Sequence, residues 1–154
     1  MRIDIQRLSN DAHVWVFGIS PALDETKSRI LLQQVDAFLD NWAAHGVPIT
    51  GARELLYGSF LVIAADEHRE KSGCSIDRMF GTLRNLEREL GVTILDSNRI
   101  FFRDGDVRAV ARHEFPQRGT LDTPVFDTTA ERLGEIRSGS WERLARDSWH
   151  SRLL

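Results

Sequence analysis

The sequence predicts an α+β protein, and three observations support this class. Short apolar runs rich in β-branched and aromatic residues alternate with two stretches of helical spacing over residues 1–103. The two most apolar runs lie at 13–19 and 60–65. A hairpin signal at Gly58 joins two adjacent runs, so the order along the chain is β-α-β-β-α-β. This is the split βαβ order of the ferredoxin-like fold, which has its first and third strands in the middle of the sheet and both helices on one face.

The first strand is expected at 13–19 and ends before Pro21. The first helix is expected to begin after Asp24, a favoured N-cap residue, and to end near His45 and Gly46. Its buried face consists of apolar residues at helical spacing: Leu31, Val35, Phe38, Leu39 and Trp42.

Two strands are expected around a two-residue turn that has Gly58 at its first central position. The run at 49–57 contains Arg53 and Glu54, and charged residues favour the edge of a sheet. The run at 60–65 is apolar throughout, which is typical of a strand buried on both faces.

The second helix is expected to have Ser75 as its N-cap, Asp77 in its first turn and Gly91 at its end. Its buried residues recur at helical spacing: Met79, Leu83, Leu86 and Leu90. The fourth strand is expected after this helix, in the apolar pieces 92–95 and 99–103 on either side of a polar turn.

Residues 104–154 form a C-terminal strand and helix extension that we expect to pack on the core of 1–103 as one structural unit. A strand at 107–113 would form a hairpin with the fourth strand, and Thr128 and Glu131 match a capping box for a short helix. A last helix is predicted from a single apolar face: Trp141, Leu144, Ala145 and Trp149. Because two tryptophans carry too much apolar area to leave in water, we expect this tail to cover the open face of the sheet or to pack on a second subunit.

The bulk composition restricts the classes of partner. The chain has 154 residues and a formal net charge of -3 at pH 7, which weighs against electrostatic binding of nucleic acid. A single cysteine excludes an intrachain disulfide and an all-cysteine metal site. The sequence has no signal-peptide pattern and no apolar run of membrane-spanning length, so we expect a cytoplasmic protein without membrane contact.

Several short motifs along the chain resemble those of one protein family. They are 14–16 (Val-Trp-Val), Trp42 with His45 and Gly46, 60–67, 72–77 (Ser-Gly-Cys-Ser-Ile-Asp), 122–126, and Ser148 and Trp149 with Arg152. The family is an uncharacterised set of small soluble bacterial proteins that often carry the borrowed label "ABC transporter ATPase". The label implies nucleotide binding, but this sequence has no G-x-x-x-x-G-K-[ST] loop. The resemblance therefore implies a small bacterial protein and no particular activity.

Cys74 is the candidate nucleophile. It is expected at the start of the second helix, where the helix dipole lowers the pKa of a thiol. His68 would be its base, with Asp66 or Glu67 to orient the imidazole. The alternative is that Cys74 only fills space, as most free cysteines do.

The same turn is a candidate anion site, since Ser72, Gly73 and Ser75 offer hydroxyl and backbone N–H groups at a helix start. Arg53, Tyr57 and Arg103 would line a ligand pocket. The alternative is that Ser75 only caps its helix and that the exposed strand residues are solvated.

Two other functions have less support. The β-α-β-β-α-β order is shared with RNA-binding domains that stack bases on sheet aromatics, but Trp15 and Phe17 are expected in the core and the basic and aromatic motif of the third strand is missing. The histidines are scattered without paired spacing, so we expect no metal site and no cofactor.

The sequence therefore predicts a non-catalytic binding module for an unidentified small molecule or protein. We expect it to self-associate, as a homodimer, through the sheet face or the tail. The two alternatives are a small thiol-dependent enzyme or redox protein that uses Cys74, and an RNA-binding protein that uses the sheet face.

Overall fold

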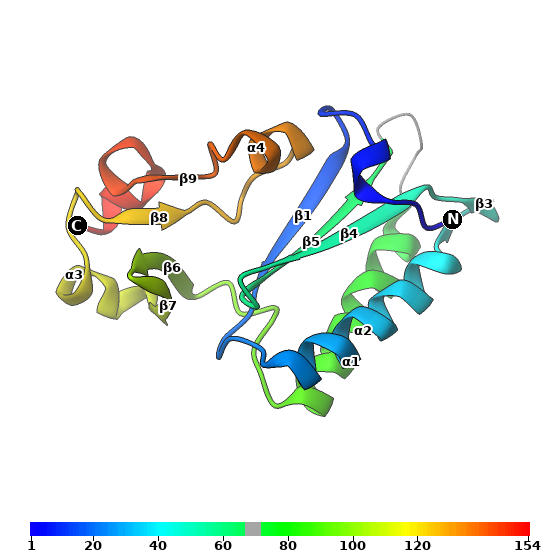
Figure 1. Ribbon diagram of the computed structural model, residues 1–154, viewed down its shortest axis with the longest axis horizontal. Helices are drawn as coiled ribbons and strands as arrows, with labels where there is room; N and C mark the ends of the chain where they lie inside the picture. Colours follow the sequence, from blue (N-terminus) through cyan, green and yellow to red (C-terminus); the bar gives the residue numbers. More distant parts are fainter. Residues whose placement is uncertain (67–71) are drawn as a thin grey trace.

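The structure of the protein is a computed structural model, which describes residues 1–66 and 72–154 (Figure 1). Its helices and antiparallel sheets confirm the α+β class. The first sheet has three antiparallel strands in the order β1-β5-β4. Their bounds are β1 (His13–Gly18), β4 (Gly51–Leu56) and β5 (Phe60–Ala65).

β5 is the central strand of the first sheet, and all six of its residues are buried. β4 is an edge strand, and four of its six residues are only partly buried. The central position of the apolar run and the edge position of the charged run are both confirmed. Burial on both faces explains why β5 is apolar at every position. β4 lies at the edge of the sheet and is partly open to solvent, so it can carry charged residues.

The turn between β4 and β5 has three residues, because Leu56 pairs directly with Phe60. Tyr57 and Gly58 both have left-handed backbone conformations, with φ values of 58° and 64°. The predicted two-residue turn is therefore wrong. A Cβ atom at Gly58 would lie 2.8 Å from the carbonyl oxygen of Leu23, so glycine is needed here for space as well as for φ.

Both long helices lie on one face of the first sheet (Figure 1). They are α1 (Glu25–Asp40) and α2 (Gly73–Leu90). Asp24 caps α1 as predicted, since its carboxylate accepts a hydrogen bond of 2.8 Å from the N–H of Lys27. α1 ends at Asp40, before the predicted stop, and His45 lies instead in the turn of a small hairpin. That hairpin consists of β2 (Ala43–Ala44) and β3 (Val47–Pro48).

The fourth strand of the predicted sheet is not formed. Thr93 makes a single antiparallel bridge with Ser20, just beyond the end of β1. The chain then leaves β1, because the carboxylate of Glu87 accepts hydrogen bonds of 2.7 and 2.9 Å from the N–H groups of Ile94 and Leu95. These two N–H groups are thus bonded to the end of α2 and are not available to a neighbouring strand.

The apolar run at 99–103 does form a strand, but it belongs to a second sheet. This sheet has the order β7-β6-β8-β9. Its strands are β6 (Arg99–Asp104), β7 (Asp106–Ala111), β8 (Pro124–Phe126) and β9 (Glu142–Leu144). The predicted hairpin between the strand at 99–103 and the strand at 107–113 is confirmed. The predicted division after residue 103 falls inside this hairpin.

The tail contains less α-helix than predicted. Its helices are α3 (Phe115–Arg118), α4 (Leu133–Ser138) and the 3-10 helices Arg112–Glu114, Ala145–Asp147 and Trp149–Leu153. α4 does not use the predicted capping box; instead the carboxylate of Glu135 accepts hydrogen bonds of 3.0 Å from the N–H groups of Glu131 and Arg132. The predicted helix between Trp141 and Trp149 is wrong, since β9 and a 3-10 helix occupy this stretch.

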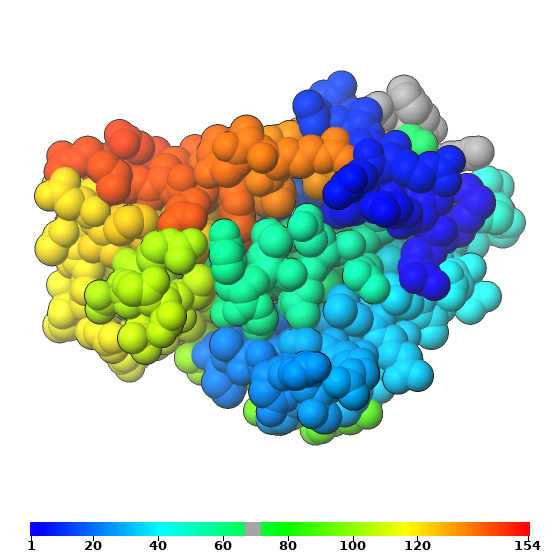
Figure 2. All heavy atoms as spheres, viewed as in Figure 1, coloured from blue at the N-terminus to red at the C-terminus, as the bar shows by residue number. Residues whose placement is uncertain are grey.

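The tail covers the face of the first sheet opposite α1 and α2. The ring of Trp141 lies 4.9 Å from that of Phe60 in β5, edge to face, and Phe126 lies 4.8 Å from Phe60. Leu133 and Ile136 of α4 belong to the same apolar cluster as Phe60, and Figure 2 shows the orange part of the chain, which contains α4, beside the dark blue N-terminal residues. The prediction that the tail covers this face is confirmed for Trp141, whereas Trp149 packs within the tail itself.

Candidate functional site

The N-terminus of α2 holds the predicted thiol and anion site. The helix begins at Gly73, with Ser72 as its N-cap in place of the predicted Ser75. The hydroxyl of Ser72 accepts a hydrogen bond of 3.1 Å from the N–H of Ser75. Cys74 is therefore in the first helical turn, and its side chain is exposed.

Ser75 has a structural role. It is 1% exposed, its hydroxyl donates to the carbonyl of Ser72 at 2.7 Å, and its own carbonyl accepts the indole N–H of Trp42 at 2.9 Å. Capping thus uses the Ser72 and Ser75 hydroxyls that the anion-site hypothesis needed. The predicted base His68 lies outside the described residues.

Arg53 lies in a network of ion pairs between β4, α1 and the N-terminal arm, which we define as residues 1–5. Its guanidinium donates two hydrogen bonds to the carboxylate of Asp36 in α1, at 2.8 and 3.0 Å. Arg2 contacts the same carboxylate at 3.2 Å and donates to Asp40 at 3.0 Å. The hydrogen bonds from Arg53 hold the pKa of Asp36 below its usual range, and the same contact raises the pKa of Arg53.

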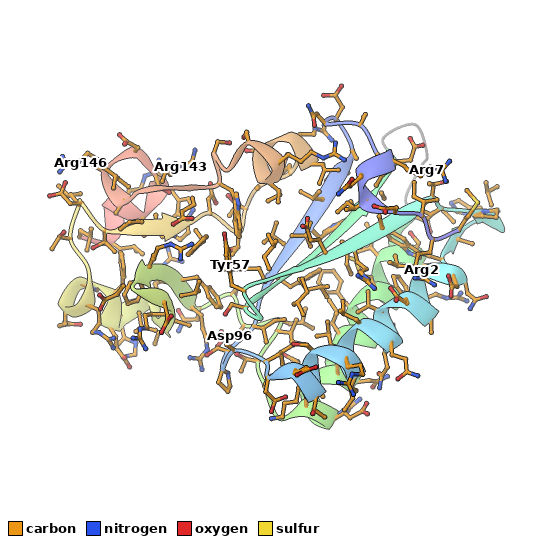
Figure 3. All side chains as sticks on the ribbon, in the orientation of Figure 1. Arg2, Arg7, Tyr57, Asp96, Arg143 and Arg146 are labelled. Carbon is orange, nitrogen blue, oxygen red and sulfur yellow. The ribbon has the colours of Figure 1, made fainter. Side chains whose placement is uncertain are left out.

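Tyr57 belongs to a different cluster. Its exposed ring lies under the guanidinium of Arg103 from β6, 5.2 Å from the ring centre, and 6.1 Å from the ring of Phe126. Arg103 also forms two hydrogen bonds with the carboxylate of Glu142, at 2.7 and 3.1 Å. Of the three residues predicted to line a pocket, the structure brings Tyr57 (labelled in Figure 3) together with Arg103, whereas Arg53 is held by Asp36.

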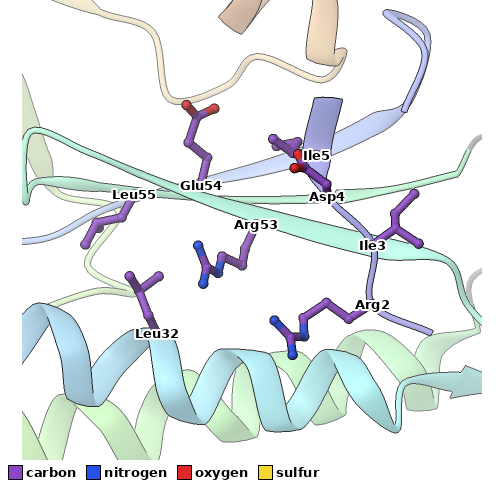
Figure 4. A pocket seen from close by; sticks show the side chains of 8 residues that line it. All are labelled: Arg2, Ile3, Asp4, Ile5, Leu32, Arg53, Glu54 and Leu55. Atoms are coloured by element: carbon purple, nitrogen blue, oxygen red, sulfur yellow. The ribbon is translucent and has the colours of Figure 1, made fainter. Parts of the chain in front are cut away.

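A cavity of about 650 Å³ lies along the outer edge of β4, between this strand, α1 and the N-terminal arm (Figure 4). This volume is in the range of ligand pockets in proteins. Its walls are formed by Arg2, Ile3, Asp4, Ile5, Leu32, Arg53, Glu54 and Leu55. Arg53 points from β4 towards α1, whereas Glu54 points to the opposite side of the strand (Figure 4).

The N-terminal arm occupies only the first part of this edge. The N–H of Gly51 donates to the carbonyl of Met1 at 3.0 Å, and its carbonyl accepts from the N–H of Ile3 at 2.9 Å. The arm then turns away into the 3-10 helix Ile5–Arg7, which the carboxylate of Asp4 caps. Further along β4, Arg53, Glu54 and Leu55 border the cavity.

Two residues of β4 that line this cavity direct their backbone groups away from β5. In an antiparallel pair, alternate residues bond to the partner strand and the residues between them point away from it. Thr50 bonds to Asp66 and Gly51 bonds to the arm, so Ala52 and Glu54 face β5 while Arg53 and Leu55 face outward. Within residues 1–66 and 72–154, no hydrogen bond satisfies the N–H or C=O of Arg53 or Leu55.

The described part of the chain offers little support for a metal site, a membrane-spanning helix or an RNA-binding face. No group of three or more His, Cys, Asp and Glu side chains is arranged there to hold a metal ion. None of the helices described is long and apolar enough to cross a membrane. The sheet face that stacking of RNA bases would need is buried under the tail, where Phe60 is 0% exposed, and Trp15 packs on Trp42 at 5.7 Å.

The sequence indicated Arg53, Glu54 and the edge position of β4, but not the rest of this site. Arg2, Asp36 and Leu32 were missed because they come from the arm and from the partly exposed face of α1. Comparison of the chain with models of known protein families, with curated proteins and with solved structures finds no match.

Proposed function

We propose that the protein is a non-catalytic, protein-binding module that binds an extended peptide segment along β4. The observation that carries this proposal is the pair of open backbone positions, Arg53 and Leu55, beside a cavity of about 650 Å³. The two N–H and two C=O groups of these residues would form hydrogen bonds with the backbone of an added strand. Such main-chain hydrogen bonds give β-strand addition its affinity. Leu32 and Leu55 would supply apolar contact on the α1 side.

The proposal is tested with three versions of one capped heptapeptide, Ser-Thr-Val-Thr-Val-Thr-Ser. Its valines would lie opposite Arg53 and Leu55 with their side chains toward α1, so their N–H groups would face β4. N-methylation of the two valines removes these donors, whereas N-methylation of the flanking threonines changes only the far edge. Since each hydrogen bond contributes about 0.5–1.5 kcal/mol, we expect the valine-methylated peptide to bind about tenfold more weakly or worse.

The matched threonine-methylated peptide is expected to bind like the parent. Titration of the full-length chain with each peptide, carrying a fluorescent label and followed by anisotropy, gives the three dissociation constants. Equal binding of all three peptides, or no binding of the parent at millimolar concentration, contradicts strand addition at β4.

A second candidate, a thiol-dependent function, is favoured by the exposure of Cys74 in the first turn of α2. The test is the rate of alkylation of Cys74 in the native protein as a function of pH. A midpoint well below about 8.5, the value for a free thiol, supports this candidate, and a midpoint at or above it removes the candidate.

We also propose that the first sheet and its two helices are a ferredoxin-like unit whose fourth strand is reduced to one bridge. The order β1-β5-β4, both helices on one face, and the bridge of Thr93 to Ser20 beside β1 support this reading. Self-association through the face of this sheet would need the tail to leave, since Trp141 and Phe126 cover Phe60. A homodimer through the outer surface of the tail stays a prediction.

A further inference from the structure

Glu54 lies between the two open positions of β4. Its side chain points away from α1, on the side opposite to Arg53 (Figure 4). Among the described residues, neither a hydrogen bond nor an ion pair involves its carboxylate. A strand added at Arg53 and Leu55 would place one of its own side chains directly opposite Glu54, at the distance of a cross-strand pair.

The charges around the cavity favour a positively charged side chain on the bound segment. Arg2 and Arg53 are already paired with Asp36 and Asp40. The remaining charged side chains that line the cavity are the carboxylates of Asp4 and Glu54, which have no ion pair in the described structure. A partner residue opposite Glu54 therefore gains most from a positive charge.

A second copy of this chain would not place a positive charge opposite Glu54. Two β4 strands related by a two-fold axis would pair both open positions in one register only, with Arg53 opposite Leu55 of the other copy. That register places Glu54 opposite Glu54, and like charges directly opposite each other destabilise a strand pair. Registers shifted to either side pair fewer open positions, because the arm occupies Gly51 and the strand ends at Leu56.

We infer that the partner of the β4 edge is an extended segment of another protein with the pattern apolar–basic–apolar, in which the basic residue faces Glu54. The apolar neighbours then lie over Leu32 and Leu55, on the α1 side. This inference rests on the proposed function, since it specifies the chemistry of the segment that the edge binds.

The test uses two labelled, capped peptides, Ser-Thr-Val-Lys-Val-Thr-Ser and Ser-Thr-Val-Glu-Val-Thr-Ser, with the native chain, E54K and D106K. Asp106 is the charge-matched control, because its side chain is 91% exposed at the tip of the β6–β7 hairpin. The native chain and D106K are expected to bind the lysine peptide about three- to tenfold more tightly at low salt. E54K is expected to reverse this order, and 0.5 M salt is expected to reduce the difference in every chain.

The outcomes separate the inference from the proposed function. If the lysine and glutamate peptides bind equally, or if E54K keeps the native preference, the inference of a basic residue opposite Glu54 is wrong. Strand addition at β4 is then still supported if N-methylation of the valines weakens binding. If neither peptide binds, or if N-methylation has no effect, the proposed function fails together with the inference. A native dimer that E54Q strengthens and that excludes the lysine peptide would also overturn the inference, in favour of a second copy.

Discussion

Phe101 packs its ring directly over Gly18, where the second sheet meets the end of β1. A Cβ atom at Gly18 would lie 2.2 Å from Cε2 of Phe101, and Phe101 is only 4% exposed and cannot move aside freely. Gly18→Ala is therefore expected to lower the free energy of unfolding by about 1–3 kcal/mol, as overpacking does. Urea denaturation measures the change.

Gly81 in α2 is the matched control for Gly18. A Cβ atom there would meet nothing within 4 Å, so Gly81→Ala is expected to stabilise the protein by up to about 1 kcal/mol through helix propensity. A Gly18→Ala variant as stable as the native chain would contradict the close contact between the two sheets.

His150 is a second residue whose environment gives a measurable effect. It is 1% exposed, its Nδ1 lies 2.7 Å from the hydroxyl of Ser148, and burial lowers its pKa to about 4. The unfolded chain binds this proton near pH 6.5, so the unfolded state takes up more protons between pH 6.5 and 4. The free energy of unfolding is expected to fall as pH drops through this window, by up to about 3 kcal/mol.

The contribution of His150 is isolated by substitution. His150→Gln is expected to remove this part of the pH dependence, whereas His113→Gln, at a side chain that is 78% exposed, keeps it. Urea denaturation of the three chains at pH 7, 5.5 and 4.5 gives the comparison. If His150→Gln shows the same slope as the native chain, the buried neutral imidazole is not the cause.

At the scale of elements, Glu87 decides where the chain goes after α2. Its carboxylate accepts the N–H groups of Ile94 and Leu95. Glu87→Ala leaves both donors without this partner, and we expect a loss of about 1–3 kcal/mol in the free energy of unfolding. Glu89→Ala, which removes only a surface hydrogen bond to Gln34, is expected to change stability much less. Equal effects of the two variants would contradict this role of Glu87.

The same contact explains which elements were predictable from the sequence. The strand at 60–65 was correct because burial on both faces requires an unbroken apolar run. The fourth strand was wrong because its fate depends on one carboxylate, seven and eight residues earlier in the chain, that removes two strand donors. The predicted start of α2 was three residues late because Ser72 and Ser75 are both good N-cap residues. In the structure Ser72 is the cap, and Ser75 lies within the helix, where its carbonyl accepts the indole N–H of Trp42.

The site was only partly predictable for a related reason. Arg53 and Glu54 were visible as charges in a strand, but Arg53 was assigned to the same pocket as Tyr57. The ion pair with Asp36 and the open edge beyond Gly51 depend on where the N-terminal arm stops pairing. Such contacts between distant segments have no local pattern in the sequence.

At the scale of the whole molecule, the tail completes the core of the first sheet. Trp141 is 5% exposed and packs on both Phe60 and Phe126. Trp141→Ala is expected to lower the free energy of unfolding by about 3–5 kcal/mol, the range for a buried aromatic residue. Leu144→Ala in the same tail is expected to cost far less, since Leu144 is 38% exposed. If the two variants unfold alike, the tail does not share a core with the first sheet.

The central claim is that β4 offers two open backbone positions to an added strand, and amide hydrogen exchange tests it most directly. In the free protein, we expect slow exchange at Ala52 and Glu54, which face β5, and fast exchange at Arg53 and Leu55. Saturation with Ser-Thr-Val-Lys-Val-Thr-Ser is expected to slow exchange at Arg53 and Leu55 selectively. Slow exchange at these two amides before the peptide is added, or fast exchange after it is added, would contradict the claim.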